Sequence, residues 1–291
     1  MRKRRVLRVL KERKLADLLD PPRPGAVFEA SGVIVNGNHC FVALDNVRRV
    51  ARIGTHLRVE SDDHRWVSAN RQGEGYEAIT YHRSAGRFYL MIEAQKHPDG
   101  TFQGAIEEYD DRWRFRGRRW VDFSFKKRNT GFEGLASLEF RGRHYLLAMC
   151  EGNKCRESRT RKKRGQGRIQ VLERRRRMWH PVARIKLPRH AAFKDFAGMA
   201  LLGDRLAVVS QESSRLWIGR LRPATWTIAG HGRIYDLPRT KKGKKLYGTV
   251  EGISWLSPRT LVAVSDFRKK RHPKRYARTD QSIHIFSIPS R

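Results

Sequence analysis

The chain has 291 residues, and its 63 Lys and Arg against 29 Asp and Glu give a formal net charge of +34 at pH 7. No apolar run approaches the roughly 20 residues that span a bilayer, and the basic start is followed by residues too charged for a secretory signal. We therefore expect a soluble, cytoplasmic, monomeric protein whose positive field attracts nucleic acid or another anion, although exposed Arg residues also suit an ordinary solvated surface.

The N-terminus allows two interpretations. Residues 5–10 alternate as in a strand, but leucines at 7, 10, 15, 18 and 19 could instead line a short helix that ends before Pro21 and Pro22. We favour the strand, which would let the N-terminus close the last unit of a ring. We divide the chain into a basic N-terminal segment, residues 1–25, and one domain, residues 26–291.

A motif centred on Gly or Ala recurs five times, with an acidic residue beside it in three copies and an apolar strand after it. Its centres lie 46, 56, 64 and 54 residues apart, at Gly32, Ala78, Gly134, Gly198 and Gly252. Self-similarity at this period in strand-rich units predicts an all-β fold, a single β-propeller of five blades.

Each motif is followed, after a short turn, by a second apolar run that suits an inner strand covered on both faces. These runs are residues 40–44, 88–92, 145–150, 206–210 and 261–265. Outer strands with one wet face are expected at residues 113–116, 168–172, 216–219 and 282–286. A sixth blade stays open, because residues 55–70 could form an extra hairpin.

Three cysteines make an odd and sparse set. Cys40 and Cys150 fall in expected inner strands, where a free thiol behaves as a small apolar side chain. The spacing of Cys150 and Cys155 also permits a local disulfide or half a metal site, but no second Cys or His pair completes such a site. We assign the cysteines no chemistry.

Hairpin geometry should gather acidic side chains at one mouth of the channel. The start of the first strand and the end of the second lie at the same end of a blade, and seven of the ten residues there are carboxylates. The pairs are Ser31 with Asp45, Glu77 with Glu93, Glu133 with Glu151, Ala197 with Gln211, and Glu251 with Asp266. Glu29 and Asp195, two residues upstream of the gaps, point to the same face of their strands.

Carboxylates that face one another must be protonated, paired with cations or bound to a metal, and oxygen-only clusters favour Ca²⁺ or Mg²⁺. We predict a metal site formed by Asp45, Glu77, Glu93, Glu133, Glu151, Glu251 and Asp266. The alternative is structural: each acid accepts hydrogen bonds from backbone amides or Arg of the next blade.

Two basic loops leave second strands at the same mouth, and we expect them to bind an anion. The candidate residues are Lys154, Arg156, Arg161, Lys162, Lys163, Arg164, Lys269, Lys270 and Arg271. An acidic floor under a basic rim is the layout of a metal that activates water against an anionic substrate such as a phosphoester. The loops could equally be polyanion-binding tails without chemistry.

Short phrases carry a family resemblance: Gly131 to Ala136, Cys150 to Asn153, Val208 to Gln211, and Val250 to Ile253 with Val264 to Asp266. They resemble uncharacterised bacterial propeller proteins similar to the SdiA-regulated and phytase-like β-propeller group. That resemblance implies calcium at an acidic channel mouth and phosphoester hydrolysis, whereas Ser31, Ala197 and Gln211 depart from a complete multi-calcium phytase site.

The favoured function is a divalent-metal-dependent phosphoester hydrolase, with no catalytic base assigned. The competing class is a non-enzymatic scaffold that binds nucleic acid or protein through basic rim loops. No Gly-x-Ser-x-Gly elbow, P-loop or dinucleotide fingerprint occurs, which argues against serine esterase, NTPase and dehydrogenase activity.

Overall fold

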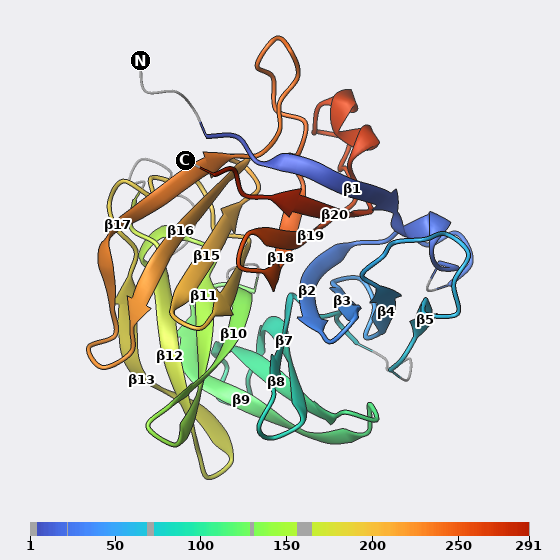
Figure 1. Ribbon diagram of the computed structural model, residues 1–291. Coiled ribbons are helices and arrows are strands. Elements are labelled where there is room, and N and C mark those ends of the chain that lie inside the picture. The colour runs from blue at the N-terminus through green and yellow to red at the C-terminus, as the bar shows by residue number, and fades with distance from the viewer. Residues whose placement is uncertain (1–4, 22, 69–72, 129–130, 156–164, 291) are drawn as a thin grey trace.

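The described residues form five four-stranded antiparallel sheets and contain no α-helix. The computed structural model describes the chain except for residues 1–4, 22, 69–72, 129–130, 156–164 and 291 (Figure 1). Blades two and three are linked by a single parallel pair between their outermost strands, Val121 with Trp179, and together make one eight-stranded sheet.

The strands follow one another from the channel outward in each blade. Blade one holds β2 (Ala30–Asn36), β3 (His39–Leu44), β4 (Val50–Gly54) and β5 (Arg65–Trp66), and blade two holds β6 (Ala78–His82), β7 (Arg87–Lys96), β8 (Phe102–Asp110) and β9 (Phe115–Phe125). Blade three holds β10 (Phe132–Phe140), β11 (Arg143–Cys150), β12 (Arg168–Arg175) and β13 (Met178–Lys186). Blade four holds β14 (Gly198–Leu202), β15 (Arg205–Ser210), β16 (Arg215–Arg222) and β17 (Thr227–Asp236). Blade five holds β18 (Val250–Ser257), β19 (Thr260–Ser265), β20 (Ser282–Ser287) and β1 (Arg8–Lys14).

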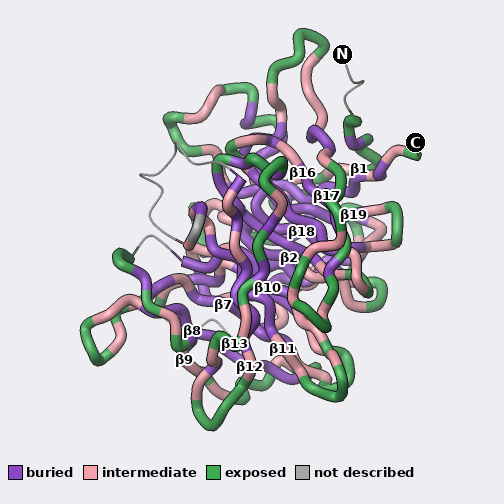
Figure 2. The backbone as a smooth tube through the Cα atoms, turned by 90° about the vertical axis from the view of Figure 1, so that its left-hand side faces the viewer, coloured by how far each residue is buried: buried purple, intermediate pink, exposed green. Residues whose placement is uncertain are grey.

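The hydrophobic core lies between the blades. Buried apolar residues of the described chain form five clusters, and each cluster joins two successive blades, including the last with the first. Figure 2 shows the buried residues concentrated in the strands, with exposed residues in the turns. Interfaces that close on themselves in this way confirm the predicted all-β propeller.

The expected outer strand at residues 113–116 was wrong at its first two residues. Asp110 accepts hydrogen bonds from the backbone N–H groups of Arg112 and Arg114 and caps a turn in which Trp113 has a φ of 59°, so strand β9 begins only at Phe115. In the candidate for an extra hairpin, residues 55–68 supply the two-residue strand β5, and residues 69–70 lie outside the described chain.

The small residues of the repeat occupy the narrowest part of the ring, which we call the waist. A Cβ on Gly32 would lie 2.9 Å from the backbone of Ala78, and one on Gly252 would lie 2.9 Å from the backbone of Gly32. Gly134 approaches the backbone of Met199 in the same way, at 3.0 Å. The motif recurs because inner strands of successive blades meet there at backbone contact distance.

The N-terminal strand closes the fifth blade, as the favoured interpretation predicts. Strand β1 pairs with β20 in antiparallel register, blue beside red in Figure 1, and is followed by the short 3-10 helix η1 (Leu15–Asp17). Glu12 on β1 accepts hydrogen bonds from His284 at 2.9 Å and from Tyr247 at 2.7 Å. Buried His284 also contacts Ser265 at 2.8 Å, so one polar network ties the first strand to the last blade.

Candidate functional site

Three glutamates stand at the mouth directly above the waist. Glu77, Glu133 and Glu251 each precede a waist residue by one position, at the start of the inner strand of blades two, three and five. The ring geometry that brings the waist residues together therefore also brings these three carboxylates together. The structure thus places these three carboxylates at one mouth of the channel.

Burial and the charges of nearby carboxylates raise the pKa of all three glutamates. Burial raises the pKa of Glu133 well above its usual range, and the charges of Glu77 and Glu151 add to the shift. Burial is also the largest cause that raises the pKa of Glu251, and the charges of Asp266 and Glu77 raise it further. No described residue makes a hydrogen bond or ion pair with the carboxylates of these three glutamates. The structural alternative, in which partners satisfy each acid, therefore does not apply to them.

The four acids at the ends of the second strands join the same cluster. Burial is the largest cause that raises the pKa of each of them to about 7: Asp45, Glu93, Glu151 and Asp266. Asp45 also hydrogen bonds to Glu29, which extends the cluster as expected from the strand face. Each of the seven predicted carboxylates thus either raises the pKa of another of them or has its own pKa raised by one.

In blade four the acid near the mouth has hydrogen-bond partners, in contrast to the three glutamates. Asp195 is buried and accepts hydrogen bonds from the Ser210 hydroxyl and the backbone N–H of Glu212, so here the structural interpretation fits. Burial nevertheless raises its pKa. Ala197 lies in the core, and Ser31 donates its hydroxyl hydrogen to the carbonyl of Tyr76 and so joins two blades.

Two cavities open at the acidic mouth. One of about 400 Å³ lies beside blades four and five and is lined by Glu151, Asp195, Gln211, Glu212, Glu251, Asp266, Lys269, Arg271, His272 and Tyr276, among others. The other, of about 420 Å³, lies beside blades one and two and is lined by Asp45, Asn46, Glu74, Gly75, Glu77, Glu93 and Arg128. Each cavity therefore has an acidic wall with at least one Lys or Arg side chain at its edge.

Only part of the predicted basic rim can be placed. Arg156 and residues 161–164 lie outside the described chain, and Lys154 belongs to the 3-10 helix η2 (Asn153–Cys155). Lys269 lies 3.9 Å from Asp266, and although burial lowers its pKa, the surrounding carboxylates outweigh burial and raise it. Lys269 and Arg271 line the cavity, whereas Lys270 is exposed.

Sequence reasoning missed several features at the mouth. Tyr276, on the 3-10 helix η4 (Lys274–Arg278), packs against Gly248, which leaves no room for a Cβ. Arg128 edges the second cavity and pairs with Glu74. The basic run at residues 126–128 signals Arg128, but no local pattern pairs Tyr276 with a glycine 28 positions earlier.

The interpretation of Cys150 as a free apolar thiol was wrong. Cys150 and Cys155 form a disulfide that encloses Glu151, one of the mouth carboxylates. Cys40 is free and buried, and burial raises its thiol pKa to about 12, which keeps it protonated and unreactive. The disulfide fixes the short turn by which blade three leaves the mouth.

Comparisons with known proteins identify the architecture. No protein-family model and no curated protein matches the chain. Among solved structures, glutaminyl cyclase from Myxococcus xanthus is similar over 99% of each chain, with a TM-score of 0.55 at 11% identity. A PQQ-bound aldose sugar dehydrogenase from Streptomyces coelicolor aligns over 97% of each chain (TM-score 0.51, 11% identity). A GH43_1 enzyme from Xanthomonas citri, complexed with xylotriose, aligns over 91% of this chain and 88% of its own, with a TM-score of 0.50 at 14% identity.

The structural similarity establishes a shared propeller fold. At sequence identities this low, it says nothing about the chemistry of this chain. The similar structures include enzymes of unrelated reactions on one architecture. Within the described part of the chain, no helix is long and apolar enough to cross a membrane. Function must therefore be argued from the mouth itself.

Proposed function

We propose that the acidic mouth binds a divalent cation, Ca²⁺ or Mg²⁺, and that the protein is a metal-dependent phosphoester hydrolase, as the resemblance to phytase-like propellers suggests. The observation that carries the proposal is the trio Glu77, Glu133 and Glu251. Burial, and then the charges of nearby carboxylates, raise the pKa of all three, and none has a hydrogen-bond or ion-pair partner among the described residues. A divalent cation would offset the burial and repulsion that raise these pKa values.

The donor chemistry fits a hard cation, because every candidate ligand is a carboxylate oxygen. Among the described residues, however, no three His, Cys, Asp or Glu side chains are arranged so that they could hold a metal ion as they stand. Binding would therefore require the glutamate side chains to turn toward the channel axis. Glu77 is partly buried and lines the second cavity, which leaves space for such a rotation.

The residues around the cation would divide the remaining work. A bound divalent cation would act as a Lewis acid toward a phosphoryl group. Lys269 and Arg271 line the same cavity as Glu251 and would bind and orient phosphate oxygens. Glu151 and Asp266, with pKa values of about 7, can each hold or release a proton near neutral pH, as general acid–base catalysis requires.

Thermal unfolding with EDTA, Ca²⁺ or Mg²⁺ tests the cation, and turnover of p-nitrophenyl phosphate and bis(p-nitrophenyl) phosphate tests the chemistry. A ligand at about 100 times its Kd stabilises the folded state by about 2.7 kcal/mol, so we expect a clear rise in Tm. Glu133→Gln with Glu251→Gln should abolish both the rise and the turnover.

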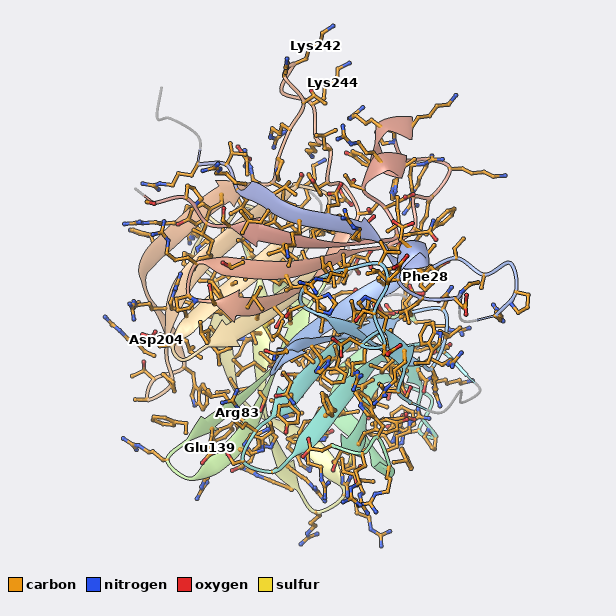
Figure 3. The ribbon with its side chains drawn as sticks, turned by 45° about the vertical axis from the view of Figure 1, so that its right-hand side comes forward. Phe28, Arg83, Glu139, Asp204, Lys242 and Lys244 are labelled. Atoms are coloured by element: carbon orange, nitrogen blue, oxygen red, sulfur yellow. A yellow bond between two sulfur atoms is a disulfide. The ribbon has the colours of Figure 1, made fainter. Side chains whose placement is uncertain are left out.

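Glu139→Gln with Asp204→Asn is the matched control, since it removes exposed Glu139 near the end of β10 and half-buried Asp204 in the β14–β15 turn, both at the opposite end of the channel (Figure 3). That variant should retain both effects. Cation stabilisation that survives in the mouth variant, or is lost equally in the control, would refute the site. Stabilisation without turnover would retain the metal and reject the hydrolase.

A further inference from the structure

We propose that a basic patch beside the mouth is a docking surface for the phosphate backbone of duplex nucleic acid. The patch comprises Lys241, Lys242 and Lys244 on one hairpin and Lys270, Arg271 and Lys274 on the neighbouring segment. This proposal does not rest on the proposed hydrolase activity. It follows from the position and order of these six cations and from their lack of ion-pair partners among the described residues.

The hairpin is an ordered element that sequence reasoning did not identify. Arg239 and Lys245 pair across it, the N–H of Thr240 donates to the carbonyl of Lys244 at 2.9 Å, and the N–H of Gly243 donates to Thr240 at 2.8 Å. Gly243 takes a φ of 73°, which a tight turn requires and a glycine adopts without strain. The lysines are therefore held in place before any partner binds.

The hairpin projects away from the propeller. Figure 3 shows Lys242 and Lys244 at its tip with their side chains directed outward, and Lys241 is exposed as well. None of these three lysines makes an ion pair with a described residue, whereas Arg239 is paired with Asp236 and Lys245 bonds to the carbonyl of Glu212. Residues 237–248 contain no acidic residue, so the field of the tip is uncompensated.

The second segment extends the patch. Arg275 donates to the carbonyl of Lys245 at 2.7 Å, and Thr279 donates to the carbonyl of Leu246 at 2.9 Å, so the two elements lie side by side. Lys270, Arg271 and Lys274 are exposed on this segment, which carries no acid between residues 268 and 275. The result is a continuous basic edge on one side of the channel mouth.

The chemistry of the patch favours nucleic acid over a lipid surface. Residues 240–245 include no apolar side chain, and membrane-binding elements need apolar side chains to insert between lipids. Projecting lysines suit evenly spaced phosphates, and a two-stranded ribbon is an element that the major groove admits. Six phosphate contacts predict that log K falls with log salt concentration at a slope of about −5.

The experiment measures binding of the full chain to a fluorescent duplex DNA of roughly 20 base pairs by anisotropy across a salt series. In Lys241→Gln, Lys242→Gln, Lys244→Gln we expect a slope of about −3 and binding weaker by on the order of tenfold or more. The control neutralises Arg175 at the end of β12 with Arg176 and Arg177 in the turn to β13, at the opposite end of blade three, with the same change in charge.

The control should keep the slope near about −5. Unchanged Tm in the hairpin variant would show that the loss is not caused by unfolding. Equal losses in both triple variants would overturn the proposal, because the net charge alone would then explain binding. So would full binding by the hairpin variant, or hairpin-dependent binding to vesicles of phosphatidylcholine and phosphatidylglycerol in place of DNA.

Discussion

Replacing Gly32 with alanine tests the waist on which the mouth is built. The new Cβ would lie 2.9 Å from both Ala78 Cα and the backbone nitrogen of Ile79, and 3.1 Å from the carbonyl carbon of Ala78. An ordinary contact begins at 3.4 Å, so blades one and two must separate locally by about 0.5 Å. Backbone atoms cannot rotate out of the way, in contrast to side chains.

The expected cost follows from these contacts. Overpacking a close-packed site lowers the free energy of unfolding by about 1–3 kcal/mol. Alanine also restricts the unfolded chain, which raises the free energy of unfolding by about 0.4–1 kcal/mol. The net loss is about 2 kcal/mol. In a chain of this size each kcal/mol lowers Tm by about 2–4 °C, so Gly32→Ala should melt about 4–8 °C below wild type.

Thermal unfolding of Gly32→Ala beside Gly104→Ala gives the decisive comparison. A Cβ on Gly104 would meet side-chain atoms of Phe132 and Met91 at 3.2 and 3.3 Å, and these can shift by a few tenths of an ångström. We therefore expect the control to stay within about 2 °C of wild type. Equal melting temperatures for the two variants would refute the explanation of the repeat by close approach of the blades.

Two further predictions concern the mouth and the ring closure. Glu93→Gln removes a carboxyl whose pKa rises from 4.5 to about 7. As the pH rises through that window, wild type should lose about 1–2 kcal/mol relative to the variant, because the folded state still holds a proton that the unfolded state has already released. Urea unfolding in EDTA at about pH 5 and pH 8 measures this difference, and a constant difference would contradict it. Glu12→Ala leaves His284 and Tyr247 without their acceptor and should cost about 3 kcal/mol, whereas Glu12→Gln, which keeps an oxygen, should cost less. Equal unfolding midpoints for the two Glu12 variants would show that the network does not secure β1.

The repeat made the architecture predictable. Residues 40–44 and 206–210 form strands that are buried on both faces. Their nearly continuous apolar runs indicate burial between blades from the sequence alone. The expected strand at residues 113–116 failed at residues 113 and 114, because alternating aromatic and Arg residues satisfy the pattern of an outer strand, whereas the carboxylate of Asp110 selects a turn there through local hydrogen bonds. A periodic pattern does not register such a capping interaction.

The position of the site was predictable from the sequence, but whether each acid has a hydrogen-bond or ion-pair partner was not. Hairpin geometry is local, so the convergence of Glu77, Glu133 and Glu251 followed from the repeat. Whether each acid finds a partner depends on residues far away in the chain, and the answers differ: Asp195 is satisfied by Ser210, whereas Glu133 has no partner among the described residues.

By itself the sequence determined the blade repeat, the small residues at the waist and the acids beside them, because each is written in short segments of fixed period. Only the tertiary structure decided that Cys150 pairs with Cys155, that Glu12 meets His284 across the ring closure, and that an ordered lysine hairpin stands beside the mouth. These features join or position groups through packing and hydrogen bonds between segments, and no local pattern encodes the energy of such contacts.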